Sequence, residues 1–323
     1  MKQCNAEGFI EQSTGLLWTK KAEIYFTVDL WVTLSCRGRR TKRNMETVPN
    51  ASTSFILLGL QEMEHYKYLY CAFLLVTYLL ILSFSLFIVF VVFVNESLHC
   101  PMYTLIANLM LTGIFGVSCF LPKLILDLFF SSKVISRAAC LIQSFCVTLF
   151  AYCEISTFTI MAYDTYLAVC HPLRYAAIMT NRTALRLIAG SLIFSLVIVA
   201  LLLFLSARLP LCGSHINNFF CDYMSIFILS CVSNPLTKLY GTIVFTAYLT
   251  GTMMTIAYSY LRILLVCLKV SRNAGKKAIH TLVTHVLNFS IFLIGTLFIF
   301  IRYRLENINL PLVFHILLSI AGL

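Results

Sequence analysis

One acidic side chain, Glu154, lies inside a long stretch from Cys140 to Tyr163 that holds no other charged residue. An ionised carboxylate is costly in lipid and usually faces the interior of a helix bundle, so Glu154 is a candidate functional residue. Its structural alternative is a neutral acid that is hydrogen-bonded to a neighbouring helix. The residues that enzymes need do not accompany it: the sequence has no nucleophile with a base at motif spacing, no glycine-rich phosphate loop and no HExxH pair. We therefore do not expect an enzyme.

The chain as a whole has too little charge to cover a water-facing surface. Of its 323 residues, 60% are hydrophobic and 11% are charged, whereas a soluble domain keeps about a quarter of its residues charged. The net charge of +11 does not indicate nucleic-acid binding, because most basic residues lie in short stretches between apolar runs, as membrane-flanking Lys and Arg do. Much of the protein surface is therefore predicted to contact lipid.

The apolar runs have the length of membrane-spanning helices, since crossing a hydrocarbon core of about 30 Å takes about 20 apolar residues. The sequence predicts an all-α membrane protein, a seven-transmembrane helix bundle formed by residues 55–323. The predicted spans cover residues 70–94, 101–122, 140–169, 187–207, 237–262, 278–301 and 310–323. The seventh would rise only about 21 Å as a helix, and we interpret it as short or truncated.

Basic residues indicate the orientation of these spans. The loops after the third and fifth spans hold eight Lys and Arg residues, against six after the second, fourth and sixth. This bias puts the amino terminus outside, in a multi-pass protein of the plasma membrane. Residues 1–54 are then an extracellular tail, of which 1–44 are interpreted as disordered or as a gene-model extension. Asn50 is the accessible N-x-[ST] site and the predicted glycosylation site.

Four of the 13 cysteines lie on the predicted outer side within the helix-bundle region. Cys140 stands at the outer end of the third span, and Cys212, Cys221 and Cys231 lie in the loop between the fourth and fifth spans. Because this side is oxidising, disulfide bonds are expected, and four cysteines allow three pairings. No CxxC pair occurs, so the sequence implies neither a zinc site nor a cofactor.

Five ordered motifs resemble those of the vertebrate odorant receptors, a family of rhodopsin-like G-protein-coupled receptors, between about Phe55 and Leu318. The resemblance is specific because all five occur in the expected spans. The motifs are Leu98–Tyr103, Met161–Cys170 with His171–Tyr175, the loop from Leu209–Gly213 through Phe219–Asp222 to Cys231, Ser259–Tyr260, and Lys277–Ala278 with Thr284–His285. Asn108 and Gly113 in the second span are closer to the fish-like branch, which senses water-borne odorants.

The resemblance implies that a small odorant shifts the receptor toward an arrangement that activates a heterotrimeric G protein. It pairs Cys140 with Cys221 and Cys212 with Cys231, and it makes Glu154 a cation site or a protonation switch. The residues matched to the family's outer pocket, each also explained by helix packing, are Val147, Thr148, Ala151, Tyr152, Val244, Tyr248, Thr296 and Phe300. The matched activation and G-protein positions are Asp164, Thr165, Tyr166, Tyr260, Lys276 and Lys277, although membrane topology alone also explains the lysines.

Arg304 is a candidate contact for an acidic odorant. It ends the sixth predicted span on the outer side, where a guanidinium can hold a carboxylate through a bidentate pair. Some members of the water-borne branch use an arginine at this place in that way. The alternative is that Arg304 extends to the membrane interface and contacts no ligand.

The sequence also departs from the family's pattern in three places. Thr165 replaces the arginine that follows the acid at Asp164, Gly113 replaces an acid in the second span, and the NPxxY-type end of the seventh span is absent. A receptor-like product that does not signal is therefore one alternative. A secondary transporter is a second alternative, but the sequence lacks the internal repeats typical of transporters.

Overall fold

The computed structural model describes residues 54–208, 213–229 and 235–269, together with 287, 289–291 and 293–295. Within these ranges, five helices are long and apolar enough to cross a membrane: α3 (Lys67–Val94), α4 (Pro101–Phe129), α5 (Arg137–Cys170), α7 (Asn181–Ala207) and α9 (Pro235–Lys269). They correspond to the first five predicted spans. The sixth is described only at helical residues between 287 and 295, and the seventh lies outside the described residues.

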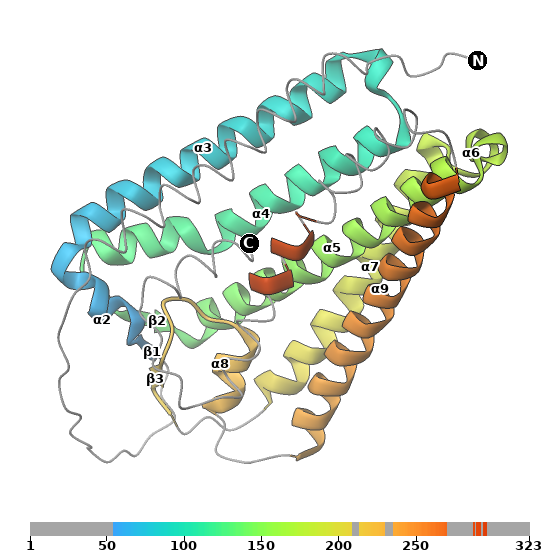
Figure 1. The fold of residues 1–323 in the computed structure, drawn as a ribbon. Coiled ribbons are helices and arrows are strands. Elements are labelled where there is room, and N and C mark those ends of the chain that lie inside the picture. Colours follow the sequence, from blue (N-terminus) through green and yellow to red (C-terminus); the bar gives the residue numbers. More distant parts are fainter. Residues whose placement is uncertain are drawn as a thin grey trace.

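Helix α5 is the central helix of the described bundle (Figure 1). It packs against α4, α7 and α9, whereas α3 packs mainly against α4. In the most apolar window of each helix, 56% of the residues of α5 are buried but only 6% of those of α3. Most side chains in this stretch of α3 are thus not buried, whereas side chains on α5 are placed to contact three neighbouring helices.

Local sequence signals fix where several helices begin. The hydroxyl of Ser136, just before α5, accepts a hydrogen bond from the Ala139 N–H at 3.3 Å. Thr180 does the same for α7, accepting from the Thr183 N–H at 3.2 Å. Both satisfy N–H groups that a helix leaves unpaired at its start. Pro101 occupies the first turn of α4, where its missing N–H is not needed.

Helix α4 continues beyond the predicted end of its span at Pro122 and reaches Phe129. The continuation contains two charged residues, and the Lys123 ammonium lies 2.8 Å from the Asp127 carboxylate one turn later. Two side chains at this spacing are neighbours on the helix surface, so their opposite charges partly compensate each other. Ending the predicted span at the first charge therefore made it shorter than the helix.

A three-stranded sheet closes one end of the bundle, and the sequence did not predict it. Its central strand, β1 (Ser54–Leu57), runs antiparallel to β2 (Val134–Ser136) and parallel to β3 (His215–Ile216). The register pairs Phe55 with Ile135 and Leu57 with Ile216. All four of these side chains are buried, so the sheet is anchored to the core beneath it.

Three short helical segments accompany this sheet: α2 (Gly59–Met63), η1 (Glu64–Tyr66) and α8 (Tyr223–Ile228) (Figure 1). We call this part of the molecule the sheet end. Gly59 makes a close approach possible, because a Cβ there would stand 2.8 Å from backbone atoms of Asn218 and Phe219.

The opposite end carries η2 (Glu96–Leu98) and the short helix α6 (Pro172–Ile178), and we call it the α6 end (Figure 1). Here the Asn181 amide donates to the His99 carbonyl at 2.7 Å, and the Thr104 hydroxyl donates to Asn181 Oδ1 at 3.2 Å. These bonds tie the start of α7 to the start of α4.

Candidate functional site

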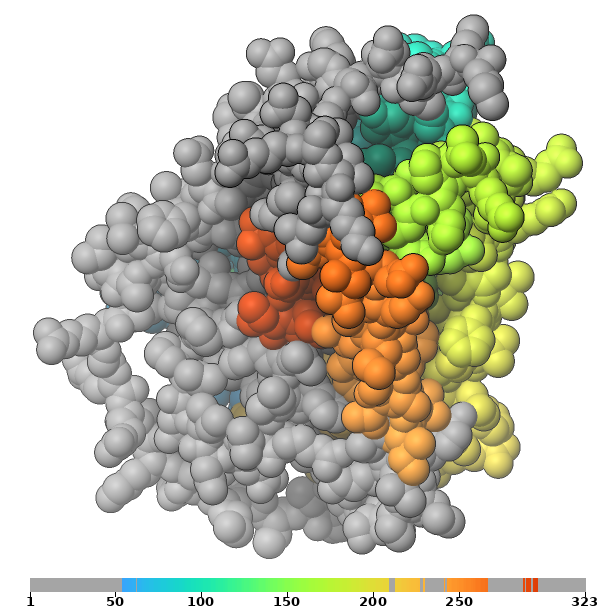
Figure 2. Space-filling view, turned by 45° about the vertical axis from the view of Figure 1, so that its right-hand side comes forward, coloured from blue at the N-terminus to red at the C-terminus, as the bar shows by residue number. Residues whose placement is uncertain are grey.

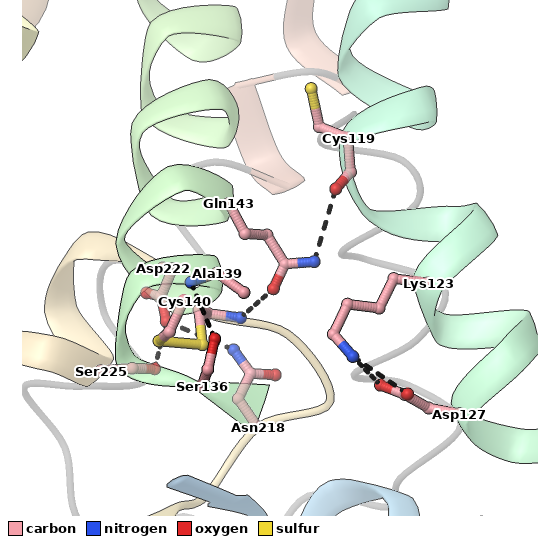
Figure 3. The surroundings of a disulfide bond; sticks show 11 residues. Cys119, Lys123, Asp127, Ser136, Ala139, Cys140, Gln143, Asn218, Asp222 and Ser225 are labelled. Atoms are coloured by element: carbon pink, nitrogen blue, oxygen red, sulfur yellow. Dashed lines mark hydrogen bonds and ion pairs between the residues drawn. A yellow bond between two sulfur atoms is a disulfide. The ribbon is translucent and has the colours of Figure 1, made fainter. Parts of the chain in front are cut away.

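A disulfide bond at the sheet end joins Cys140 of α5 to Cys221, which lies between β3 and α8 (Figure 3). Both cysteines are fully buried. This is one of the two pairs that the family resemblance implied, and Cys212 and Cys231 lie outside the described residues. Next to the bond, the ring centroid of Phe220 lies 5.6 Å from that of Phe120 on α4. The segment around Cys221 is thus held against both α5 and α4.

Two predicted pocket residues, Tyr152 of α5 and Tyr248 of α9, are brought together with ring centroids 4.7 Å apart. The Tyr248 hydroxyl lies 2.6 Å from Ser156 Oγ and 3.1 Å from the Tyr152 carbonyl oxygen. Ser156 itself donates to that carbonyl at 2.8 Å. The polar end of Tyr248 is therefore held by α5, and the tyrosine links the two helices.

The other predicted pocket residues do not form a comparable contact with one another, or lie outside the described residues. Val147, Thr148 and Ala151 on α5 and Val244 on α9 are half-buried. Val147 packs against the buried cluster that contains the disulfide. Val244 lies one helical turn from Tyr248, toward the sheet end. Thr296, Phe300 and Arg304 lie outside the described residues. The described ranges therefore supply two of the helices of the predicted pocket, α5 and α9.

Glu154 is buried and accepts a hydrogen bond from the Thr112 hydroxyl of α4, with 2.6 Å between the oxygens. One turn away, the Asn108 amide donates to Thr157 Oγ1 at 2.9 Å. A Cβ at Gly113, where the family has its acid, would meet no atom within 4 Å. Among the described residues, no three His, Cys, Asp or Glu side chains gather as a metal site. A carboxyl oxygen can accept this bond in either protonation state, so both interpretations of Glu154 stay open.

At the α6 end, Asp164 is buried and accepts a hydrogen bond of 2.9 Å from the hydroxyl of Tyr175 on α6. Burial and the neighbouring Asp164 carboxylate raise the pKa of Tyr175 above its ordinary value, so the hydroxyl keeps its proton at physiological pH. Thr165 makes no substitute for the family's arginine, because its hydroxyl donates to the Met161 carbonyl of its own helix at 2.8 Å.

The other predicted residues of this end are partly described. The Tyr166 hydroxyl lies 3.1 Å from Nε2 of His171, and Tyr166 and Tyr260 both pack around the fully buried Ile263 of α9. These contacts join α5 to α9 near the α6 end. Lys276, Lys277 and the predicted glycosylation site Asn50 lie outside the described residues.

Sequence reasoning gave no role to four residues that the structure brings to these places: Gln143 and Ser156, which it did not name, and Leu173 and Tyr175, which it named only as part of a motif. Ser156 follows Tyr152 by one turn, so the face of α5 that carries Tyr152 was a usable signal. Leu173 is an apolar residue of the short helix α6, and it is 98% exposed. No sequence signal pointed to the contacts of Gln143, which depend on a distant loop.

Comparison with known proteins identifies the family. The olfactory receptor family model matches residues 73–323. Mouse olfactory receptor 6E1 is 32% identical over 252 residues, which cover 77% of this chain and 80% of the relative. Human olfactory receptor 1M1 is 36% identical over 239 residues, covering 73% and 76%, and human olfactory receptor 2A12 is 34% identical over 247 residues, covering 75% and 79%. Assignment to the fish-like branch stays a prediction. The chain belongs to the olfactory receptor family of seven-helix G-protein-coupled receptors, not to a family of enzymes.

Proposed function

We propose that the sheet end faces the outside of the cell and the α6 end faces the cytoplasm. The Cys140–Cys221 disulfide supports this orientation, because structural disulfides persist in an oxidising compartment. The α6 end carries Arg174, Arg182 and Arg186, as expected for a cytoplasmic loop. In this orientation Asn50, shortly before β1, is the proposed glycosylation site.

The proposed ligand is a small odorant, bound between α5, α9 and the sixth span. The observation that carries this proposal is the contact of Tyr152 with Tyr248, which places two aromatic rings and the hydroxyl of Ser156 at the α5–α9 interface. Ligand sites typically combine such aromatic surface with a few polar groups. We extend the proposal to acidic, water-borne odorants because the sequence puts Arg304 at the outer end of the sixth span.

The proposed partner at the α6 end is a heterotrimeric G protein. Leu173 and Arg174 are exposed on α6, which lies on the molecular surface (Figure 2). An exposed large apolar side chain beside a cation is suited to protein contact. Asp164 and Tyr175 hold this surface against α5. An odorant that binds one arrangement of α5 and α9 more tightly shifts the population toward it, by that difference in affinity and no more.

A cyclic-AMP assay in cells that express the full chain tests both parts of this proposal. A defined mixture of amino acids and short-chain carboxylates should produce a saturable response. Arg304→Gln should raise the half-maximal carboxylate concentration on the order of tenfold, because a bidentate charged pair is lost. Leu173→Ala should lower the maximal response without changing the amount of receptor at the surface. A silent wild-type receptor that reaches the surface would contradict the signalling proposal.

A receptor-like protein that binds but does not signal is the second candidate, and Thr165 favours it. The Thr165 hydroxyl is engaged with its own helix at Met161 and offers no cation to a partner. Replacement by arginine, Thr165→Arg, distinguishes the candidates. A response that appears only in this variant favours the non-signalling reading of the natural chain, whereas a response already present in the natural chain excludes it.

A further inference from the structure

Gln143 lies one turn beyond Cys140 on α5 and is 7% exposed (Figure 3). Its Oε1 accepts a hydrogen bond from the backbone N–H of Cys221 at 2.8 Å. Its Nε2 donates to the backbone carbonyl of Cys119 on α4 at 3.4 Å. A single side chain thus contacts the backbone of two segments that are far apart in the sequence.

The chemistry of the amide fixes its orientation. The carbonyl oxygen of a glutamine only accepts hydrogen bonds and its NH₂ group only donates them. The opposite orientation would place two donors against each other at Cys221 and two acceptors at Cys119. The side chain therefore joins α5, α4 and the Cys221 segment in one defined arrangement, and burial makes the loss of either bond costly.

The contact adds something that the neighbouring disulfide does not supply. The disulfide holds the Cys221 side chain, but rotation about its single bonds leaves the direction of the backbone less restricted. Gln143 holds the N–H of the same residue. On α5, Val147 follows Gln143 by one turn and packs against the cluster that contains Phe220 and Cys221. The segment that Gln143 positions therefore borders the proposed pocket at the sheet end.

We propose that Gln143 is a positioning residue, which sets the place of the Cys221 segment over the odorant pocket by holding its backbone. The pocket part of this inference rests on the proposed function. The placement of the segment does not, and it is measurable without a ligand.

Hydrogen–deuterium exchange of the purified full chain in detergent micelles tests the placement. Gln143→Met keeps the length of the side chain and removes both hydrogen bonds, so amides around Cys221 should exchange on the order of tenfold faster. Ser144→Ala is the matched control, because Ser144 is fully buried on the same helix and its hydroxyl has no hydrogen-bond partner among the described residues. Its exchange near Cys221 should equal that of the wild type. Equal exchange in Gln143→Met would overturn the proposal.

A milder variant keeps the test decisive if Gln143→Met does not fold. Gln143→Asn retains the amide but is too short by one carbon to reach both backbones, so exchange near Cys221 should still accelerate. Gln143→Glu keeps the acceptor for the Cys221 N–H and should restore protection there. The assigned role would be contradicted if Gln143→Glu left the amides near Cys221 unprotected. It would also be contradicted if Gln143→Asn exchanged like the wild type.

The functional part has its own measurement, which uses the same mixture of amino acids and short-chain carboxylates. In the cyclic-AMP assay, Gln143→Asn should shift the half-maximal concentration several-fold and leave the maximal response unchanged. A merely structural role would instead lower the surface level and the maximum together. If the wild type does not respond to the mixture, the proposed function fails and the exchange experiment still decides the role of Gln143.

Discussion

Among the residues that the structure describes, different contacts hold the two ends of this receptor together. At the sheet end, a disulfide, a three-stranded sheet and the contacts of Gln143 fix three separate segments. At the α6 end, the described contacts include hydrogen bonds, such as Tyr175 to Asp164 and Asn181 to His99, and the packing of Tyr166 and Tyr260 around Ile263. A native disulfide contributes about 2–5 kcal/mol, whereas one hydrogen bond contributes about 0.5–1.5 kcal/mol net. Of these described contacts, the single hydrogen bonds are therefore the least costly to break.

Removing the disulfide should produce the largest effect. Cys221→Ser breaks the covalent bond to Cys140 at a fully buried position and should cost about 2–5 kcal/mol. Because membrane receptors that fold poorly are retained inside the cell, surface staining should fall close to background. Cys146→Ser is the control, since Cys146 is a free cysteine on the same helix. Equal surface levels of the two variants would show that the disulfide does not stabilise the sheet end.

A pair of glycine substitutions compares the packing of the two ends. The Cβ of Gly59→Ala would lie 2.8 Å from the backbone of Asn218 and Phe219, which cannot rotate aside as a side chain can. We expect a loss of about 2–3 kcal/mol, the upper part of the range for overpacking, measured as a lower thermal unfolding temperature in micelles.

Gly190→Ala, in the half of α7 nearer the α6 end, is the matched control. A Cβ there meets no atom within 4 Å. The variant should be neutral or gain up to about 1 kcal/mol, because alanine is the better helix former. A similar loss in both variants would mean that the sheet end is not the more tightly packed of the two.

The long helices could be predicted from the sequence, whereas the sheet and the exact helix ends could not. The long helices follow from apolar runs, because lipid leaves the backbone few alternatives to a helix. The bounds of α4 do not follow, since Lys123 and Asp127 compensate each other one turn apart. The strands of the sheet are too short for an alternating pattern to stand out, and their pairing depends on loops that meet only after the helices pack.

The sequence predicted some residues of the candidate sites but not the residues that they contact. Tyr152 and Tyr248 were identified through a resemblance to a known family, and the structure places them in contact. The partners of these residues were not identified, because Ser156 and Gln143 act through backbone atoms and neighbours on other elements. A polar residue in an apolar helix is expected to have a hydrogen-bond partner, but its position in the sequence does not identify that partner.

A smaller effect is expected from the contact between α5 and α6. Tyr175→Phe removes the hydroxyl that donates to Asp164 and should cost about 1.5 kcal/mol, the lower value for a hydrogen bond to a carboxylate. If this bond belongs to the resting arrangement, ligand-independent cyclic AMP should rise. Since the pKa of Tyr175 is raised, the wild-type bond should persist at mildly alkaline pH. Tyr163→Phe, on the exposed side of α5, should leave basal signalling unchanged.

The smallest effect tests whether the bonds of the α6 end act together. The Thr104 hydroxyl has one proton and two acceptors, Asn181 Oδ1 at 3.2 Å and the Cys100 carbonyl at 3.3 Å. Both distances are long for a hydroxyl hydrogen bond, so Thr104→Val should lower the free energy of unfolding by only about 0.5 kcal/mol. Unfolding temperatures of this variant, of Tyr175→Phe and of the double variant complete a double-mutant cycle. Additive losses mean that the bonds break independently, and a coupling above about 0.5 kcal/mol means that the α6 end opens as one unit. The second result would mean that the contact between α4 and α7 is coupled to the contact between α5 and α6.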